Sequence, residues 1–591
     1  MDMSRAKIFY TTRLGETEAL YKEQRQKLIS ISLIRLFLFV GIVALGIYLR
    51  ETTLLLFADL LIGGSIFLFL VKKYYDQKEL IHRSKNHIAV LKHRLENLEG
   101  NFSSQNSGKK YLPKVHDFAG DMDLFGKGSL FEKVNTTSTI EGEAHLANLF
   151  LANDISDVVE KQMLIKDFTK SDDFRLNFAG EAVGDLDHEK VTQAYNYIEN
   201  YSGIEFKFGR IIPRLFSVIS LALIALFSFD VLSFTPILIW GVAGLGISGL
   251  YFKRVNEFSQ KTGLLEPVLK MQVSLLTLLQ TVNFESDFGK RMVQRFNSAD
   301  LKPDQIVKHF SSIVSRLDQR NNMLFGFVAN ALFLWDINQM IQVQSWLSKY
   351  KELWLDWRAG IAEVDAYIAL GDFAFHNEHY IYPTLSKSNL VLANNLGHPL
   401  IDSEKLVSNS ISVDSENLWI ITGANMAGKS TFLRSVGLGV IMSNMGMPVH
   451  AESYSYQPIK LISSMRTSDS LMEESSYFHA ELYRLKYVLD HTENSPYLVL
   501  LDEILKGTNS VDKAEGSKQF LKKLNKGNAT TLVATHDLSL CELSDDSQGI
   551  YNYFFEAVIE SDELYFDYKL RSGICKNMNA SYLLKKMNLV D

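Results

Sequence analysis

A glycine-rich stretch that ends in lysine and serine carries the clearest chemistry of this chain. Residues 423–430 read GANMAGKS, with an apolar run before them and an apolar helical pattern after them. Two glycines allow a tight loop whose backbone N–H groups point at phosphate oxygens, the lysine reaches the terminal phosphates, and the serine hydroxyl ligates magnesium. We therefore predict a nucleoside triphosphate site with Lys429 and Ser430 in these two roles, rather than a plain glycine-rich turn.

Two further apolar runs end in side chains that suit this chemistry. Residues 497–501 lead into Asp502 and Glu503, and residues 531–535 lead into His536. Ligands of open α/β sheets bind where buried strands end. Asp502 suits a partner of magnesium, Glu503 suits a group that orients and deprotonates water, and His536 suits a γ-phosphate sensor. Solvated acids and a lone loop histidine are the alternatives, but the order after the glycine-rich stretch favours catalysis.

The elements that must position these residues are strands alternating with helices. Such alternation predicts an α/β nucleotide-binding domain on a parallel sheet, with a strand-rich tail at 551–570 that adds antiparallel strands. Before this domain, residues 257–358 have the pattern of long helices rich in Leu, Val and Phe. We expect strands at residues 418–422, 460–464, 497–501 and 531–535.

Four apolar runs predict membrane-spanning helices in two hairpins, because a bilayer core needs about 20 apolar residues per helix. Arg35 is the only charge of the first run and Asp59 that of the second, and these two could pair across the first hairpin. An ion path is the functional alternative to a structural pair, and core helices of a soluble protein are the alternative to spans. The runs cover residues 28–49, 52–71, 215–229 and 231–252.

Charge and cysteine content restrict the environment of the protein. Cations flank all four outer ends of the runs, which predicts a cytoplasmic membrane protein whose soluble parts face the cytoplasm. The 591 residues carry a net charge of -7, so nucleic-acid binding would need a local patch. The two cysteines, Cys541 and Cys575, fit no metal motif and favour a reducing compartment. The charged N-terminus does not predict a cleavable signal peptide.

Three motifs together resemble the ATPase domain of the MutS family, which acts in DNA mismatch repair. They are GANMAGKST at 423–431, DEILKGTNS at 502–510 and ATH at 534–536, and the Asn-Met pair inside the first is a specific marker. The resemblance extends loosely over the helices from Leu124 onward and tightly over residues 395–582. It implies nucleotide contacts from Gly423, Asn425, Met426, Gly428, Lys429, Ser430 and Thr431.

The resemblance also implies an ABC-like ATPase that uses ATP and Mg²⁺ in composite sites of a homodimer. Glu503, His536 and Lys429 would be catalytic, Ser430 and Asp502 would hold the metal. Ser476 and the loop around Asn509 would act in trans on the partner's nucleotide, although residues 507–512 could also be an ordinary polar loop with an N-cap. The homodimer would bind DNA mainly through backbone contacts and be embedded in the membrane.

The chain departs from the family pattern in its domain order. We expect a transmembrane hairpin and linker helix at 1–110, a helical core and lever at 111–385 interrupted by the second hairpin (211–253), and the ATPase domain at 386–591. The mismatch-reading domain of the family is expected to be missing, and Glu474 stands where the trans segment usually has glycine. An ABC-like transporter and a scaffold that moves membrane hairpins or recruits a protein remain alternatives to DNA binding.

Overall fold

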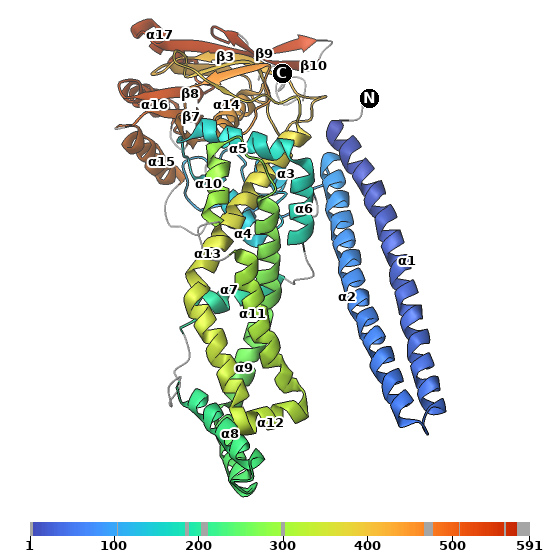
Figure 1. The fold of residues 1–591 in the computed structure, drawn as a ribbon. Helices are drawn as coiled ribbons and strands as arrows, with labels where there is room; N and C mark the ends of the chain where they lie inside the picture. Colours follow the sequence, from blue (N-terminus) through green and yellow to red (C-terminus); the bar gives the residue numbers. More distant parts are fainter. Residues whose placement is uncertain are drawn as a thin grey trace.

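The computed structural model is mostly helical, with strands gathered at one end of a long stalk (Figure 1). The stalk consists of α9 (Thr235–Leu279), α11 (Pro303–Asp318) and α13 (Trp335–His376). A separate pair of helices stands beside it. The structure describes residues 4–102, 105–183, 188–202, 211–296, 302–465, 477–493, 495–506, 509–560 and 563–575.

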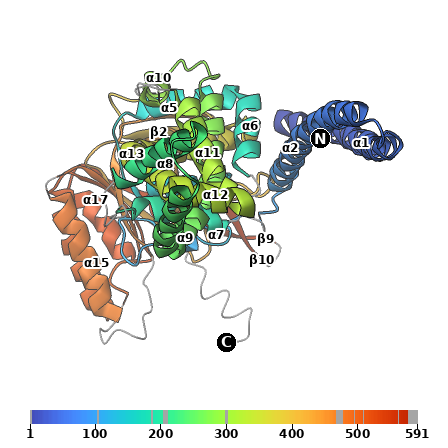
Figure 2. The same ribbon diagram turned by 60° about the horizontal axis from the view of Figure 1, so that its bottom comes forward.

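The separate pair contains the first predicted hairpin. It consists of α1 (Arg5–Tyr48) and α2 (Thr53–Leu98), and each is one continuous helix that extends well beyond the apolar run within it. Figure 2 shows the pair at one side of the molecule, with α6 as the nearest helix. In the apolar windows of both helices only 6% of the residues are buried, and both helices are long and apolar enough to cross a membrane.

The predicted pairing of Arg35 with Asp59 is wrong. The Arg35 guanidinium lies over the ring of Tyr74, 4.5 Å from its centroid. Asp59 instead lies beside Gly46 and Gly63, and its Oδ2 atom has no hydrogen-bond partner within the described part of the chain. The two helices bring Asp59 level with Gly46 on α1, about three turns from Arg35 on the same helix, so the two side chains do not meet.

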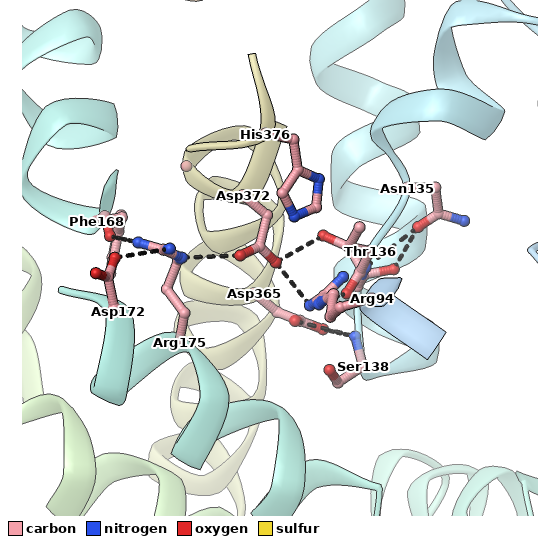
Figure 3. Close-up of polar contacts among 12 residues, drawn as sticks. Arg94, Asn135, Thr136, Ser138, Phe168, Asp172, Arg175, Asp365, Asp372 and His376 are labelled. Carbon is pink, nitrogen blue, oxygen red and sulfur yellow. Dashed lines mark hydrogen bonds and ion pairs between the residues drawn. The ribbon is translucent and has the colours of Figure 1, made fainter. Parts of the chain in front are cut away.

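A buried cluster of polar residues fixes this hairpin to the end of the stalk (Figure 3). Asp372 on α13 binds Arg94 Nη2 of α2 at 2.6 Å and Arg175 Nε at 2.8 Å, and it accepts a hydrogen bond from Thr136 Oγ1 at 3.0 Å. Arg175 belongs to α6 (Asp172–Ala182). Burial opposes ionisation of Asp372, but the two arginines together hold its pKa below its usual range.

The first helix of the hairpin joins the same cluster. Tyr10 Oη on α1 lies 3.0 Å from His376 Nε2, one turn beyond Asp372 on α13. Burial lowers the pKa of His376 to about 3, although Asp372 acts in the opposite direction. We call Tyr10, Arg94, Thr136, Arg175, Asp372 and His376 the Asp372 cluster.

The remaining helices cover the stalk and its far end. The third apolar run forms a helix of 17 residues, α8 (Ile212–Ser228), and the fourth forms the start of α9, which is long and apolar enough to cross a membrane. A short apolar helix within the range predicted as long helices, α12 (Met323–Phe333), meets α13 at a bend of 82°. The other helices of this region are α3 (Leu130–Val134), α4 (Ile140–Leu151), α5 (Val158–Lys170), α7 (His188–Glu199) and α10 (Asp287–Phe296).

The main sheet has six strands in the order β10-β9-β4-β8-β7-β6. The predicted strands are confirmed as β4 (Leu418–Gly423), β6 (Lys460–Ser464), β7 (Tyr497–Asp502) and β8 (Ala529–Ala534), and they pair in parallel. The tail was predicted to add antiparallel strands, which is wrong for its first strand. β9 (Ile550–Glu560) pairs in parallel with β4, and only β10 (Glu563–Ser572) is antiparallel.

A second, smaller sheet was not predicted. Its order is β1-β5-β2-β3. The strands are β1 (Thr384–Leu385), β2 (Val391–Leu396), β3 (Asn409–Val413) and β5 (Ser453–Tyr456). Between and around the two sheets lie α14 (Lys429–Asn444), α15 (Tyr477–Thr492), α16 (Ser510–Asn525) and α17 (Leu543–Asp546).

Candidate nucleotide site

Strand register brings the predicted catalytic residues to one edge of the main sheet. Ala534 on β8 is the register partner of both Ile421 on β4 and Asp502 on β7. All three strands run in the same direction, so the residues that follow them leave the sheet at the same level. The strand β4 that leads to this edge is buried along its whole length.

The glycine-rich stretch forms a loop between β4 and α14. Gly423 and Gly428 have φ angles of 143° and 105°, and a Cβ at Gly423 would lie 2.6 Å from the carbonyl oxygen of Phe555. Both positions therefore require glycine. Met426, with φ 65°, is 84% exposed at the tip of the loop. Asn425 beside it and Thr431 in the following helix are exposed too.

Lys429 points back into this loop. Its Nζ donates to the carbonyl oxygens of Gly423 at 2.8 Å and Ala424 at 2.9 Å, and it lies 3.3 Å from His536 Nε2. Burial lowers the pKa of Lys429, while the charges of Asp502 and Glu503 act against that shift. The lysine thus occupies the space enclosed by the loop and the ends of the neighbouring strands.

Glu503 and His536 form a direct pair. Glu503 Oε1 lies 2.8 Å from His536 Nε2, and the bond from His536 lowers the pKa of Glu503 to about 2. The backbone of Glu503 has φ 50°, and its N–H donates to the Ala534 carbonyl at 2.9 Å. A non-glycine residue at such an angle is uncommon and is held here by the neighbouring strand. Glu503 is therefore ionised across the physiological pH range.

A cavity of about 630 Å³ unites these residues and fits the size of a nucleotide. Tyr568 and Lys506, which the sequence analysis missed, also line it. Tyr568 sits at a bulge of β10 with its ring 3.1 Å from a Cβ built on Gly428, and Lys506 Nζ lies 3.8 Å from Glu503 Oε2. The predicted residues in the lining are Asn425, Met426, Gly428, Lys429, Ser430, Thr431, Asp502, Glu503 and His536.

The donor set of this cavity fits magnesium. The Ser430 hydroxyl and the Asp502 carboxylate both line it, and magnesium prefers a few such oxygen ligands together with substrate phosphates and water. Within the described residues there is no group of three or more His, Cys, Asp or Glu side chains that could hold a metal by itself. Magnesium would therefore be held jointly with a phosphate ligand.

Of the two residues predicted to act in trans, the structure describes Asn509 alone. Ser476 lies outside the described residues. Asn509 is the N-cap of α16, where its side chain accepts a hydrogen bond from the N–H of Asp512 at 2.9 Å. This is the ordinary structural role considered for the segment, and a role in trans stays a prediction.

Comparison with known proteins agrees with this geometry. The family model described as MutS domain V matches residues 419–589. The DNA mismatch repair protein MutS of Caldanaerobacter subterraneus subsp. tengcongensis is 31% identical over 220 residues, which is 36% of this chain and 25% of that protein. MutS protein homolog 4 of Mus musculus is 33% identical over 193 residues, or 31% of this chain and 20% of that protein. The MutS of Clostridium kluyveri is 30% identical over 251 residues, or 41% and 28%.

Residues 419–589 of the chain are therefore similar to domain V, the ATPase domain, of the MutS family. This domain contains the glycine-rich loop, the Glu503–His536 pair and the cavity between them. The match spans only about a quarter of the length of the curated relatives.

Proposed function

We propose that this protein binds and hydrolyses ATP in a P-loop domain of the ABC-like class. The observation that carries the proposal is the meeting of Lys429, Glu503 and His536 at one edge of the parallel sheet. The β8 strand, which leads to His536, lies between β4 and β7. The site thus offers a cation for phosphates, a carboxylate for water and a histidine that contacts both.

The residues of the cavity would share the work of hydrolysis. Lys429 would exchange its bonds to the loop carbonyls for bonds to the β- and γ-phosphates. Glu503 would accept a proton from the attacking water, and His536 would hold the carboxylate in position and contact the γ-phosphate. Ser430 and Asp502 would hold magnesium, which neutralises phosphate charge when bound.

ATP turnover by the purified full-length protein in detergent tests this proposal. Wild-type protein is expected to hydrolyse ATP with magnesium, and Lys429→Ala is expected to lose about 100-fold or more of that activity. Lys526→Ala, on an exposed turn of the same domain, is the matched control and is expected to hydrolyse ATP normally. Equal activity of the wild type and Lys429→Ala would overturn the assignment.

We further propose that ATP drives dimer closure and that the dimer binds DNA, mismatched or branched, at the cytoplasmic face of the membrane. The similarity to DNA mismatch repair proteins named MutS supports this step. Binding would depend on phosphate contacts and so weaken steeply with salt. Gel shifts with duplex, mismatched and branched DNA, with and without ATP, are expected to show salt-sensitive complexes. Absence of any complex at low salt would exclude the DNA role.

The membrane part of the proposal concerns four spans in two hairpins, with the domain boundaries near residues 110 and 385. Three helices, α1, α2 and α9, are long and apolar enough to cross a membrane. The fourth proposed span, α8, has 17 residues and would cross only with help from its flanks. Labelling of cysteines placed at both hairpin tips, from either side of sealed vesicles, tests the orientation.

A second candidate function is supported by the Asp372 cluster, which joins the membrane hairpin to the stalk. Closure of the ATPase domains would then move membrane hairpins or recruit a protein partner without DNA. Such a scaffold predicts a specific protein in pull-downs with ATP-trapped protein and no DNA affinity in the same preparation. Stimulation of ATP hydrolysis by a solute in liposomes would instead favour a transporter.

A further inference from the structure

Helix α12 exposes large apolar side chains at the far end of the stalk. Its sequence, MLFGFVANALF, contains no charge. Met323 is 87% exposed, Leu324 81%, Phe327 61% and Val328 53%. Such a dense patch is costly in water and marks a surface that something covers.

The face that α12 turns toward the protein consists of small residues. Gly326, Ala329 and Ala331 are its buried positions. A Cβ at Gly244 of α9 would collide with the backbone carbonyl of Ala331, so α9 and α12 touch along their backbones. A soluble protein buries its large apolar residues, whereas helices packed in lipid bury small ones and expose large ones. The distribution of small and large residues on α12 is therefore that of a helix packed in lipid.

Side-chain donors bind the backbone carbonyl groups at the bend between α12 and α13. The Phe333 carbonyl accepts hydrogen bonds from Ser217 Oγ at 2.9 Å and Asn338 Nδ2 at 2.8 Å. Ser220 Oγ donates to the Leu332 carbonyl. Helix breaks in a membrane need such side-chain donors because lipid offers none.

Exposed cations lie near both ends of α12. At its start, Arg320 contacts Asn256, so Lys253 and Arg254 lie about one turn away on α9. At its end, Asn338 contacts the carbonyl of Pro213, directly before Arg214. Lys253, Arg254 and Arg214 are all exposed. Cations at this level complement the phosphates of lipid headgroups.

We propose that α12 is a membrane-embedded helix that lies along the headgroup boundary of a bilayer containing anionic phospholipid. Its 11 residues span about 16 Å, too short for a hydrocarbon core of about 30 Å. The second membrane unit therefore consists of three helices, α8, the start of α9, and α12. This inference rests on the proposed membrane attachment of the hairpins.

Single cysteines carrying the fluorophore NBD test this assignment in the full-length protein. The native Cys541 and Cys575 are buried, so labelling is directed to the introduced site. Phe327→Cys reports on α12, with Leu324→Cys as a second position if the first variant folds poorly. Leu61→Cys on the exposed surface of α2 reports on the hairpin, and Val115→Cys on an exposed loop reports on the aqueous part. All are reconstituted in phosphatidylcholine–phosphatidylglycerol vesicles.

The expected result is a lipid environment for α12. NBD at position 327 should be quenched at least twofold by lipids with a spin label near the headgroup end of the acyl chain, and be shielded from aqueous iodide. NBD at position 115 should behave in the opposite way. Iodide quenching at 327 equal to that at 115 would overturn the proposal. Shielding from iodide without quenching by spin-labelled lipid would overturn it in favour of a second copy of the chain.

The hairpin variant separates this proposal from the one on which it depends. If position 61 is quenched by the spin-labelled lipid and position 327 is not, only the assignment of α12 fails. If neither position is quenched, both the proposed membrane attachment and the proposed position of α12 are wrong. ATP hydrolysis by each labelled protein, measured in parallel, shows whether the proposed ATPase function stands independently.

Discussion

Glu503 is bonded to His536 at 2.8 Å and ionised over the whole physiological pH range, which prepares it to accept a proton from water. Glu503→Gln keeps the shape of the side chain but removes this capacity. We expect ATP hydrolysis to fall by about 10²–10⁴-fold while ATP binding persists. Turnover and binding of a fluorescent ATP analogue measure the two effects separately.

The matched control for this change is Glu515→Gln, on an exposed position of α16 in the same domain. It should hydrolyse ATP at the wild-type rate. If Glu503→Gln also hydrolysed ATP at the wild-type rate, another group would have to activate the water. Lys506, whose Nζ lies 3.8 Å from Glu503 Oε2, cannot accept a proton while it is a cation.

His376 gives the Asp372 cluster a pH dependence. Its folded pKa of about 3 lies below the usual value of about 6.5, so its contribution to stability is complete above pH 6.5 and is lost as the pH falls toward 3. Each pH unit within this window costs about 1.4 kcal/mol. The charges around it are Asp372 on its own helix and Arg94, Arg175 and Lys133 on α2, α6 and α3.

We expect His376→Gln to remove this dependence while keeping a hydrogen bond to Tyr10. Between pH 7 and pH 5 the wild type should lose about 2 kcal/mol more stability than the variant. Thermal unfolding in detergent at several pH values measures the difference. If the stability of the two proteins changed with pH in parallel, protonation of His376 would not lower the stability.

Motifs in the sequence predicted the phosphate-loop, acidic and histidine residues of the cavity but not the rest of its lining. The glycine-rich loop, Asp502, Glu503 and His536 are readable because their roles fix both residue type and position after a strand. Tyr568 reaches the cavity only because a bulge in β10 changes its direction, and no spacing rule encodes that bulge. Lys506 lies in the loop after β7, and the direction of this loop depends on the positive φ angle of Glu503.

At the scale of elements, α9 and α12 approach too closely to admit a side chain at Gly244. Gly244→Ala is expected to destabilise the protein by about 1–3 kcal/mol, because the obstacle is backbone and cannot rotate away. Gly246→Ala in the same helix meets open space and should be neutral or stabilising by up to about 1 kcal/mol. Thermal unfolding of both variants in detergent gives the comparison, and equal effects would contradict the close contact.

The attachment of α2 to α13 depends on a charge pair that is nearly fully buried. Asp372→Asn removes the ion-pair partner of the buried Arg94 and leaves Arg175 with Asp172 alone, and we expect a loss of about 3–5 kcal/mol. Hydrogen exchange in α1 and α2 near the cluster should rise. Asp356→Asn, which breaks the half-exposed pair with Arg295, is the control and should cost about 1 kcal/mol or less.

Periodicity predicted the strands of the main sheet and the long helices, since buried strands and helices have distinct apolar patterns. It missed the second sheet because β1, β2, β3 and β5 are short and interrupted by loops, with no continuous apolar run. It assigned the first strand of the tail, β9, a wrong direction because alternation along a strand carries no information on its neighbour. It placed α12 in a region of long helices but did not separate it from them, because its apolar run is only 11 residues long.

At the scale of the whole molecule, the apolar surfaces of α1, α2, α9 and α12 predict integral attachment to membranes. Vesicle-bound protein should therefore stay with the vesicles during flotation in alkaline carbonate or in 1 M salt, since hydrophobic burial is not screened by ions. A charge-held peripheral protein, in contrast, would be released by salt. Release into the soluble fraction would count against every membrane assignment made above.

Helix α13 can act as a lever arm, because the Asp372 cluster holds the first hairpin at one end of this long helix. The helix has 42 residues and is therefore about 63 Å long, with the first hairpin fixed near His376 and the proposed second membrane unit at Trp335. On such an arm, each degree of rotation at the ATPase end displaces the far end by about 1 Å. A turn of a few degrees at the nucleotide site would thus change the lateral spacing between the two hairpins by several ångströms.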